Sequence, residues 1–109
     1  MHSLFKSKNF TWSLFVGHLV IEKLIKALHV KKNHSNALFI HDLQRLTGKI
    51  PLEVTEEQKK TLNTITSFNI KARYVDYKND FYKRCNKEFT TEWIKIIEET
   101  RLWIKELLK

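Results

Sequence analysis

The sequence has little cysteine, proline and glycine: one Cys, one Pro and two Gly among 109 residues. The single cysteine, Cys85, excludes a disulfide within the chain, so we expect a reducing, cytoplasmic environment. No apolar run reaches the roughly 18–20 residues that a membrane span needs. The longest run, Leu14–Ile21, already contains Gly17 and His18, and no small-residue cleavage site follows it. We therefore expect neither a membrane segment nor a secretion signal.

The sequence does contain enough apolar residues for one core. Hydrophobic residues make up 42% of the chain and aromatic residues 12%, which excludes a disordered or collagen-like protein. We expect a single domain over residues 1–109. The net charge of +8 is spread over both halves of the chain. A basic surface favours nucleotides, nucleic acids or acidic proteins, and a solvated lysine-rich surface explains the charge equally well.

Apolar residues recur at spacings of three and four, and no segment alternates with a period of two between turn residues. This pattern predicts an all-α fold, an antiparallel up-and-down bundle of four to five helices. The long helices are expected at about 10–30, 55–71 and from 90 or 91 to the C-terminus, and shorter helical pieces at 3–8, 39–47 and 80–85. Residues 31–36 and 73–77 interrupt the pattern and are expected to connect helices.

Two local signals mark helix ends. Gly48 is placed to stop the 39–47 helix. Thr55 and Gln58 form a capping box at the start of the next helix, and Glu56 and Glu57 suit its positive N-terminal end.

A polar stripe on the 10–30 helix is the first candidate for chemistry. His18, Glu22, Lys26 and His29 follow one another at steps of four, four and three, so they share a face. Glu22 and Lys26 are spaced for an ion pair, which on spacing alone is a surface salt bridge or part of a binding site. In the same way, the neighbouring His41 and Asp42 either cap and pack a short helix or contribute to a site.

The second candidate is the segment Arg73–Tyr77, which places an Arg, two Tyr and an Asp between helices. The guanidinium of Arg73 suits a phosphate group, and the ring of Tyr74 offers a stacking face. An Arg73–Asp76 ion pair that ties the connection down is the alternative. We expect no metal and no cofactor, because the histidines near Asp42 form no tight ligand pair and no glycine-rich run precedes Lys49.

The order of these motifs resembles the HEPN domain family. The resemblance rests on Phe15–Leu28, His41–Leu43 and Ala72–Asp76, and it extends over about residues 10–108. The family implies a four- or five-helix bundle that commonly dimerises. It includes nucleotide-associated domains encoded beside minimal nucleotidyltransferases, often as toxin–antitoxin pairs. Against the family pattern, the first helix is shortened here to about residues 3–8.

Some members of the family are metal-independent ribonucleases that use an Arg followed, after four to six residues, by a His. No Arg of this sequence has a His at that spacing, so the ribonuclease site cannot be carried over. We therefore expect a non-catalytic module that binds a nucleotide or nucleic acid, a partner nucleotidyltransferase, or both. A ribonuclease toxin with an atypical site and a purely structural interaction domain remain alternatives.

The expected ligand patch joins the two candidate regions, with lysines and Arg73 on phosphate, Tyr74 stacking, and carboxylates orienting the cations. Its members are Glu22, Lys23, Lys26, His41, Asp42, Arg73, Tyr74 and Asp76. We also expect a homodimer, because a shortened first helix leaves apolar surface uncovered on the 10–30 helix or the last one.

Overall fold

The computed structural model describes residues 9–33, 42–48, 50, 53–73 and 75–108, without the side chains of 33 and 75–78. Within these ranges every regular element is a helix, so the all-α prediction is confirmed. The helices are α2 (Phe10–Asn33), α3 (Leu43–Thr47), α4 (Glu56–Arg73), α5 (Val75–Arg84) and α6 (Lys87–Leu108). The shortened first helix expected at 3–8 lies outside the described residues. No helix in the described part is long and apolar enough to cross a membrane.

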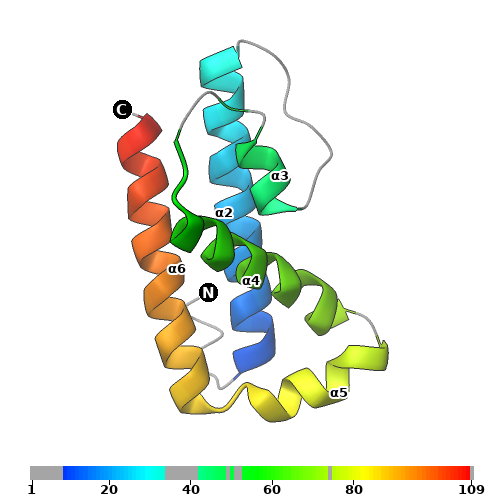
Figure 1. Ribbon diagram of the computed structural model, residues 1–109. Coiled ribbons are helices and arrows are strands. Elements are labelled where there is room, and N and C mark those ends of the chain that lie inside the picture. Colours follow the sequence, from blue (N-terminus) through cyan, green and yellow to red (C-terminus); the bar gives the residue numbers. More distant parts are fainter. Residues whose placement is uncertain (1–8, 34–41, 49, 51–52, 74, 109) are drawn as a thin grey trace.

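Helices α2 and α6 run in the same direction, from the bottom to the top of Figure 1, and lie side by side. Helix α4 crosses diagonally in front of them, from the left to the lower right. The Lys31 side chain at the end of α2 donates a hydrogen bond to the Leu108 carbonyl at the end of α6. The short α3 packs on both α2 and α4, and α5 turns the chain from α4 back to α6.

One apolar core lies where α2, α4 and α6 meet. Every described helix contributes buried apolar residues to it. They include Leu14, Ile21 and Ile25 of α2, Leu43 and Leu46 of α3, Leu62, Ile65 and Phe68 of α4, Phe81 of α5, and Ile97 and Ile104 of α6. The Phe68 ring stacks on Phe81 with centroids 5.6 Å apart and meets Trp93 edge-on at 5.2 Å. Since these three rings come from α4, α5 and α6, they fix the corner at which the three helices join.

The expected capping box is confirmed at the start of α4. The Thr55 backbone N–H donates to Gln58 Oε1 at 2.9 Å, and the Gln58 backbone N–H donates to Thr55 Oγ1 at 3.1 Å. Gly48 follows the last residue of α3, as expected, although its backbone is right-handed rather than left-handed.

Several predicted boundaries are wrong. Helix α2 continues to Asn33 instead of entering a loop at Lys31, because lysines are good helix formers and suit the negative C-terminal end. Helix α3 begins at Leu43, after the expected start, since Asp42 has extended backbone angles and caps it. Its Oδ1 accepts a hydrogen bond from the Arg45 N–H at 3.2 Å.

The other two errors concern α5 and α6. Residues 75–77 belong to α5, which continues to Arg84. Phe81 within α5 and Cys85 directly after its end are both buried in the core. Helix α6 starts at Lys87 rather than at 90 or 91. Asn86 caps it, its Oδ1 accepting from the Phe89 N–H at 2.8 Å.

Candidate functional site

The polar stripe of α2 is buried rather than exposed. His18 is 0% exposed, Glu22 6% and His29 5%. Lys26 Nζ lies 3.3 Å from Glu22 Oε2, and His18 Nε2 lies 3.8 Å from Glu22 Oε1. The expected Glu22–Lys26 pair is therefore confirmed, but the Glu22 carboxylate is buried rather than on the surface.

This burial limits what the stripe can do. A carboxylate taken out of water needs a cation or hydrogen-bond donors, and Lys26 supplies the charge. The Lys26 ammonium is committed to Glu22, and a fully buried His18 ring offers no access to a dissolved substrate. We interpret the stripe as a structural brace within the bundle.

Two further members of the expected patch lie along one edge of α4. The Leu43 N–H, next to Asp42, donates to Thr66 Oγ1 of α4 at 3.0 Å. Arg73 stands seven residues beyond Thr66 on the same face, about two turns or ~10.5 Å along the axis. Its Nη1 donates to Asn69 Oδ1 at 3.4 Å, and the residue is exposed.

The remaining members are distributed as follows. Lys23 is exposed on α2, and Asp42 is engaged as the cap of α3. His41 and Tyr74 lie outside the described residues, as does the side chain of Asp76, so an Arg73–Asp76 pair stays a prediction. The contact that the structure shows within the expected patch is the one between Glu22 and Lys26.

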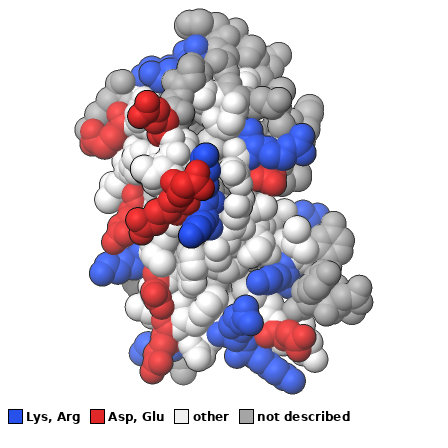
Figure 2. Space-filling model, viewed as in Figure 1, with Lys and Arg blue, Asp and Glu red and all other residues white. Residues whose placement is uncertain are grey.

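A stronger concentration of positive charge lies around Arg73. Residues 71–87 contain six basic and two acidic residues, a net +4. We call the five described cations of this segment the basic corner: Lys71, Arg73, Lys83, Arg84 and Lys87. None of the five forms an ion pair with any residue that the structure describes. In Figure 2, Lys and Arg dominate the lower right of the molecule, over α5 and the end of α4.

Cys85, directly after α5, is buried beneath this corner. Burial raises the pKa of its thiol, and the charges of Arg84 from α5 and Lys71 from α4 oppose that rise. The buried thiol itself is a small core residue under the corner.

The arrangement suits anions rather than metals. Within the described ranges, no three His, Cys, Asp or Glu side chains gather closely enough to hold a metal ion. Unpaired guanidinium and ammonium groups bind phosphate oxygens by charge-assisted hydrogen bonds.

Comparison with protein families agrees with the motifs and the helix order. The model of the HEPN domain matches residues 1–107, nearly the whole chain. The chain belongs to the HEPN domain family. Searches among curated proteins and among solved structures found no significant match.

Within this HEPN domain, the motif residues divide into two groups. Those in Phe15–Leu28 mainly build the core and the brace, whereas Arg73 of the third motif reaches solvent. No single motif of the sequence points to Lys83, Arg84 or Lys87. The net charge of +4 over residues 71–87 would have indicated them. This local excess is hidden when net charge is counted separately for the two halves of the chain.

Proposed function

We propose that this HEPN domain is a non-catalytic module that binds the phosphate groups of a nucleotide or nucleic acid at the basic corner. The observation that carries the proposal is the set of five cations from three helices, none of which forms an ion pair with a residue that the structure describes. Other described cations, such as Lys60 and Lys95, also lack an ion pair, but the corner gathers five such cations within residues 71–87. Cations left unpaired in one region raise the local potential and attract phosphate.

Arg73 is the residue shared by the expected patch and the basic corner. Among the residues that the structure describes, its hydrogen-bond partner is a neutral amide and no carboxylate pairs with it, which leaves donors for a phosphate. Arg84 offers a second planar fork, and the lysines add positive charge without a fixed geometry. Lys26 is not part of the phosphate site, because its ammonium group is paired with Glu22.

Membership of the HEPN family supports the same class of ligand. The family includes nucleotide-associated domains that act with minimal nucleotidyltransferases, and we extend to this chain the proposal of such a partner and of a toxin–antitoxin role. No catalytic step is proposed, since no Arg of the chain has a His at the ribonuclease spacing.

The test measures binding of a fluorescein-labelled oligoribonucleotide by fluorescence anisotropy. The double variant Lys83→Ala/Arg84→Ala should bind about tenfold more weakly than the wild type, because two phosphate contacts are lost. A matched control, Lys95→Ala/Lys105→Ala, removes two exposed lysines of α6 and should bind almost as tightly as the wild type.

Equal losses in the two double variants would show that the attraction is spread over the whole surface, which contradicts a defined corner. The RNA recovered from the assay should be uncut. Metal-independent cleavage that disappears in His41→Ala or Arg73→Ala would instead support the atypical ribonuclease.

A further inference from the structure

Tyr82 on α5 is an aromatic residue that the fold leaves in solvent. It is 72% exposed, more than any other large hydrophobic residue that the structure describes. It forms no hydrogen bond or ring contact with any described residue, whereas the adjacent Phe81 stacks on Phe68 in the core. A single exposed aromatic residue is common on protein surfaces, so the neighbours of Tyr82 decide what it can do.

Asn79, Tyr82 and Lys83 form one exposed face of α5, which we call the α5 face. Because Tyr82 and Lys83 stand three and four residues after Asn79, both are its neighbours on the helix surface. Phe81 lies on the opposite, buried side. The acidic residue Asp80 stands about 160° around the helix from Tyr82, at about 100° per residue. The α5 face therefore combines an amide, an aromatic ring and a cation, and Asp80 lies outside it.

The α5 face has a firm support. Phe81 is 3% exposed, and its ring stacks on Phe68 with centroids 5.6 Å apart. Phe68 in turn meets Trp93 of α6 edge-on at 5.2 Å. These contacts hold the backbone of α5 in place, and a tyrosine side chain has only two torsions to order. Binding to the Tyr82 ring therefore costs little conformational entropy.

The ring also belongs to the most basic part of the chain. Lys83 and Arg84 of the basic corner directly follow Tyr82. Proteins that bind single strands combine cations along the phosphate backbone with aromatic rings on which the bases stack. In a duplex the face of each base is covered by its neighbours, so a side chain stacks on bases that are unpaired and splayed out.

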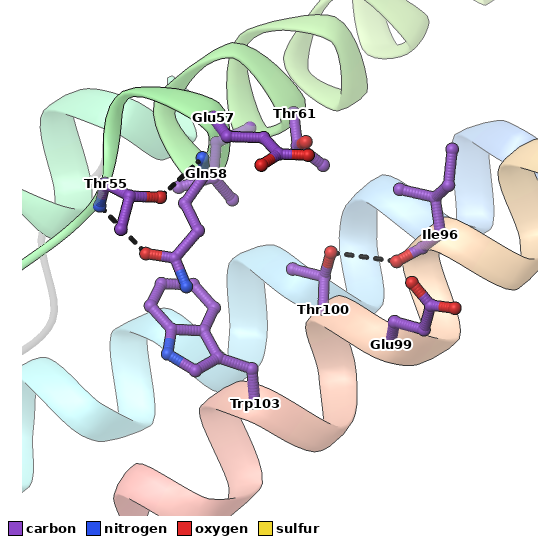
Figure 3. A pocket seen from close by; sticks show the side chains of 9 residues that line it. Thr55, Glu57, Gln58, Thr61, Ile96, Glu99, Thr100 and Trp103 are labelled. Atoms are coloured by element: carbon purple, nitrogen blue, oxygen red, sulfur yellow. Dashed lines mark hydrogen bonds between the residues drawn. The ribbon is translucent and has the colours of Figure 1, made fainter.

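Trp103 provides a contrast, because it is a partly exposed ring in a different electrostatic setting. It lines a hollow of about 380 Å³ between α4 and α6, together with Glu57 and Glu99 (Figure 3). No Lys or Arg lines this hollow, and its two carboxylates repel a phosphate. A ring and cations thus meet at Tyr82 but not in the hollow.

We propose that Tyr82 stacks on an unpaired base of a single-stranded nucleic acid whose phosphates bind at the basic corner. The inference rests on the proposed function of the corner and specifies its ligand, a strand with unpaired bases. The Asn79 amide, which both donates and accepts, hydrogen-bonds to the edge of that base. Lys83 contacts the neighbouring phosphate.

The test compares two fluorescein-labelled strands of about ten units by fluorescence anisotropy, a length within the usual site sizes for single strands. One is oligothymidylate, and the other is an abasic deoxyribose-phosphate chain, which has the same phosphates without bases. Tyr82→Ala should weaken binding of oligothymidylate about tenfold, as the loss of one base–aromatic stack predicts. It should weaken binding of the abasic chain by less than about twofold, because no phosphate contact is lost.

Two control variants accompany Tyr82→Ala. Tyr82→Phe keeps the ring and should bind both strands as the wild type does. Leu102→Ala removes another exposed large hydrophobic side chain, on α6 and outside the basic corner, and should also bind both strands normally. Because the tyrosine ring is uncharged, Tyr82→Ala should leave the salt dependence of oligothymidylate binding unchanged.

Equal losses with the two strands in Tyr82→Ala, or no loss with either, would overturn the stacking proposal. Lys83→Ala/Arg84→Ala tests the corner separately and should weaken binding of both strands. If it does so while Tyr82→Ala has no effect, the stacking proposal alone fails. If it weakens neither strand, phosphate binding at the corner is wrong, and the inference that rests on it fails as well.

Discussion

Glu22 is the one buried acidic residue among those that the structure describes. Its carboxylate has Lys26 on one oxygen and the His18 ring 3.8 Å from the other. Removing one partner of a buried pair costs more than the pair contributes, because the remaining charge is left unsatisfied. Lys26 is partly exposed and can recover some hydration, which reduces that cost.

Glu22→Ala should therefore lower the free energy of unfolding by about 2 kcal/mol. Urea unfolding followed by tryptophan fluorescence measures this change. The control is Lys23→Ala, the next residue along α2 but exposed, which should change stability by less than about 0.5 kcal/mol. Equal effects of the two substitutions would show that the stripe is not a brace.

Arg73, unlike Glu22, should contribute to RNA binding and little to stability. It is exposed, and its removal costs one long hydrogen bond to Asn69. Arg73→Ala should change stability by no more than about 0.5 kcal/mol while weakening binding of the labelled RNA severalfold. Loss of several kcal/mol, with RNA binding unchanged, would identify Arg73 as part of a brace instead.

Spacing predicted the Glu22–Lys26 pair correctly, because residues four apart on a helix are neighbours in any fold. Spacing could not predict that the pair is buried, since that depends on how α4 and α6 pack on α2. The grouping of cations from α4 and α5 in the basic corner could not be predicted for the same reason. It depends on the angle between α4 and α5, which no local pattern encodes.

At the scale of the helices, side-chain caps decide where the elements begin. Asp42, Thr55 and Asn86 each accept a hydrogen bond from a backbone N–H three residues later. The apolar periodicity predicted a start of α6 at 90 or 91, whereas the cap at Asn86 places the start at Lys87. Phe89, which packs near Phe68, confirms that the extra turn belongs to the helix.

Asn86→Ala should destabilise the protein by about 1 kcal/mol, the usual cost of losing an N-cap. The control Glu92→Ala lies at an exposed position farther along α6 and should have an effect below about 0.5 kcal/mol. Thermal unfolding by circular dichroism compares the two. An unchanged midpoint for Asn86→Ala would mean that tertiary packing alone fixes the start of α6.

At the scale of the whole molecule, α2 is apolar on two sides. Its inward side lines the core, whereas the outward sector carries Trp12, Val16, Leu19, Val20, Ala27 and Val30, with Lys23 among them. Trp12 and Val30 are 41% and 43% exposed. Apolar surface of this kind usually marks an interface, so we still expect a homodimer, now through α2.

Ala27→Glu tests this interface without touching the core, because Ala27 is exposed on the outward sector. The wild type should be a dimer by light scattering at high micromolar concentration, and Ala27→Glu should be a monomer. Asn63→Glu on α4 introduces the same charge at another exposed position and should remain a dimer. A monomeric wild type would contradict the expectation.

The basic corner lies at the end of α4, and its five cations form no ion pair with any residue that the structure describes. Phosphate recognition at the corner makes a quantitative claim about salt. For single-stranded nucleic acid, the logarithm of the binding constant falls with the logarithm of salt concentration by about 0.7 per phosphate contact.

The most direct test is therefore a salt titration of RNA binding to the wild type and to Lys83→Ala/Arg84→Ala. The wild-type slope should be about −2 or steeper, as three or more phosphate contacts require. In the double variant the slope should be shallower by about 1.4, because two contacts are lost. A wild-type slope near zero, or one that the double variant leaves unchanged, would contradict phosphate binding at the basic corner.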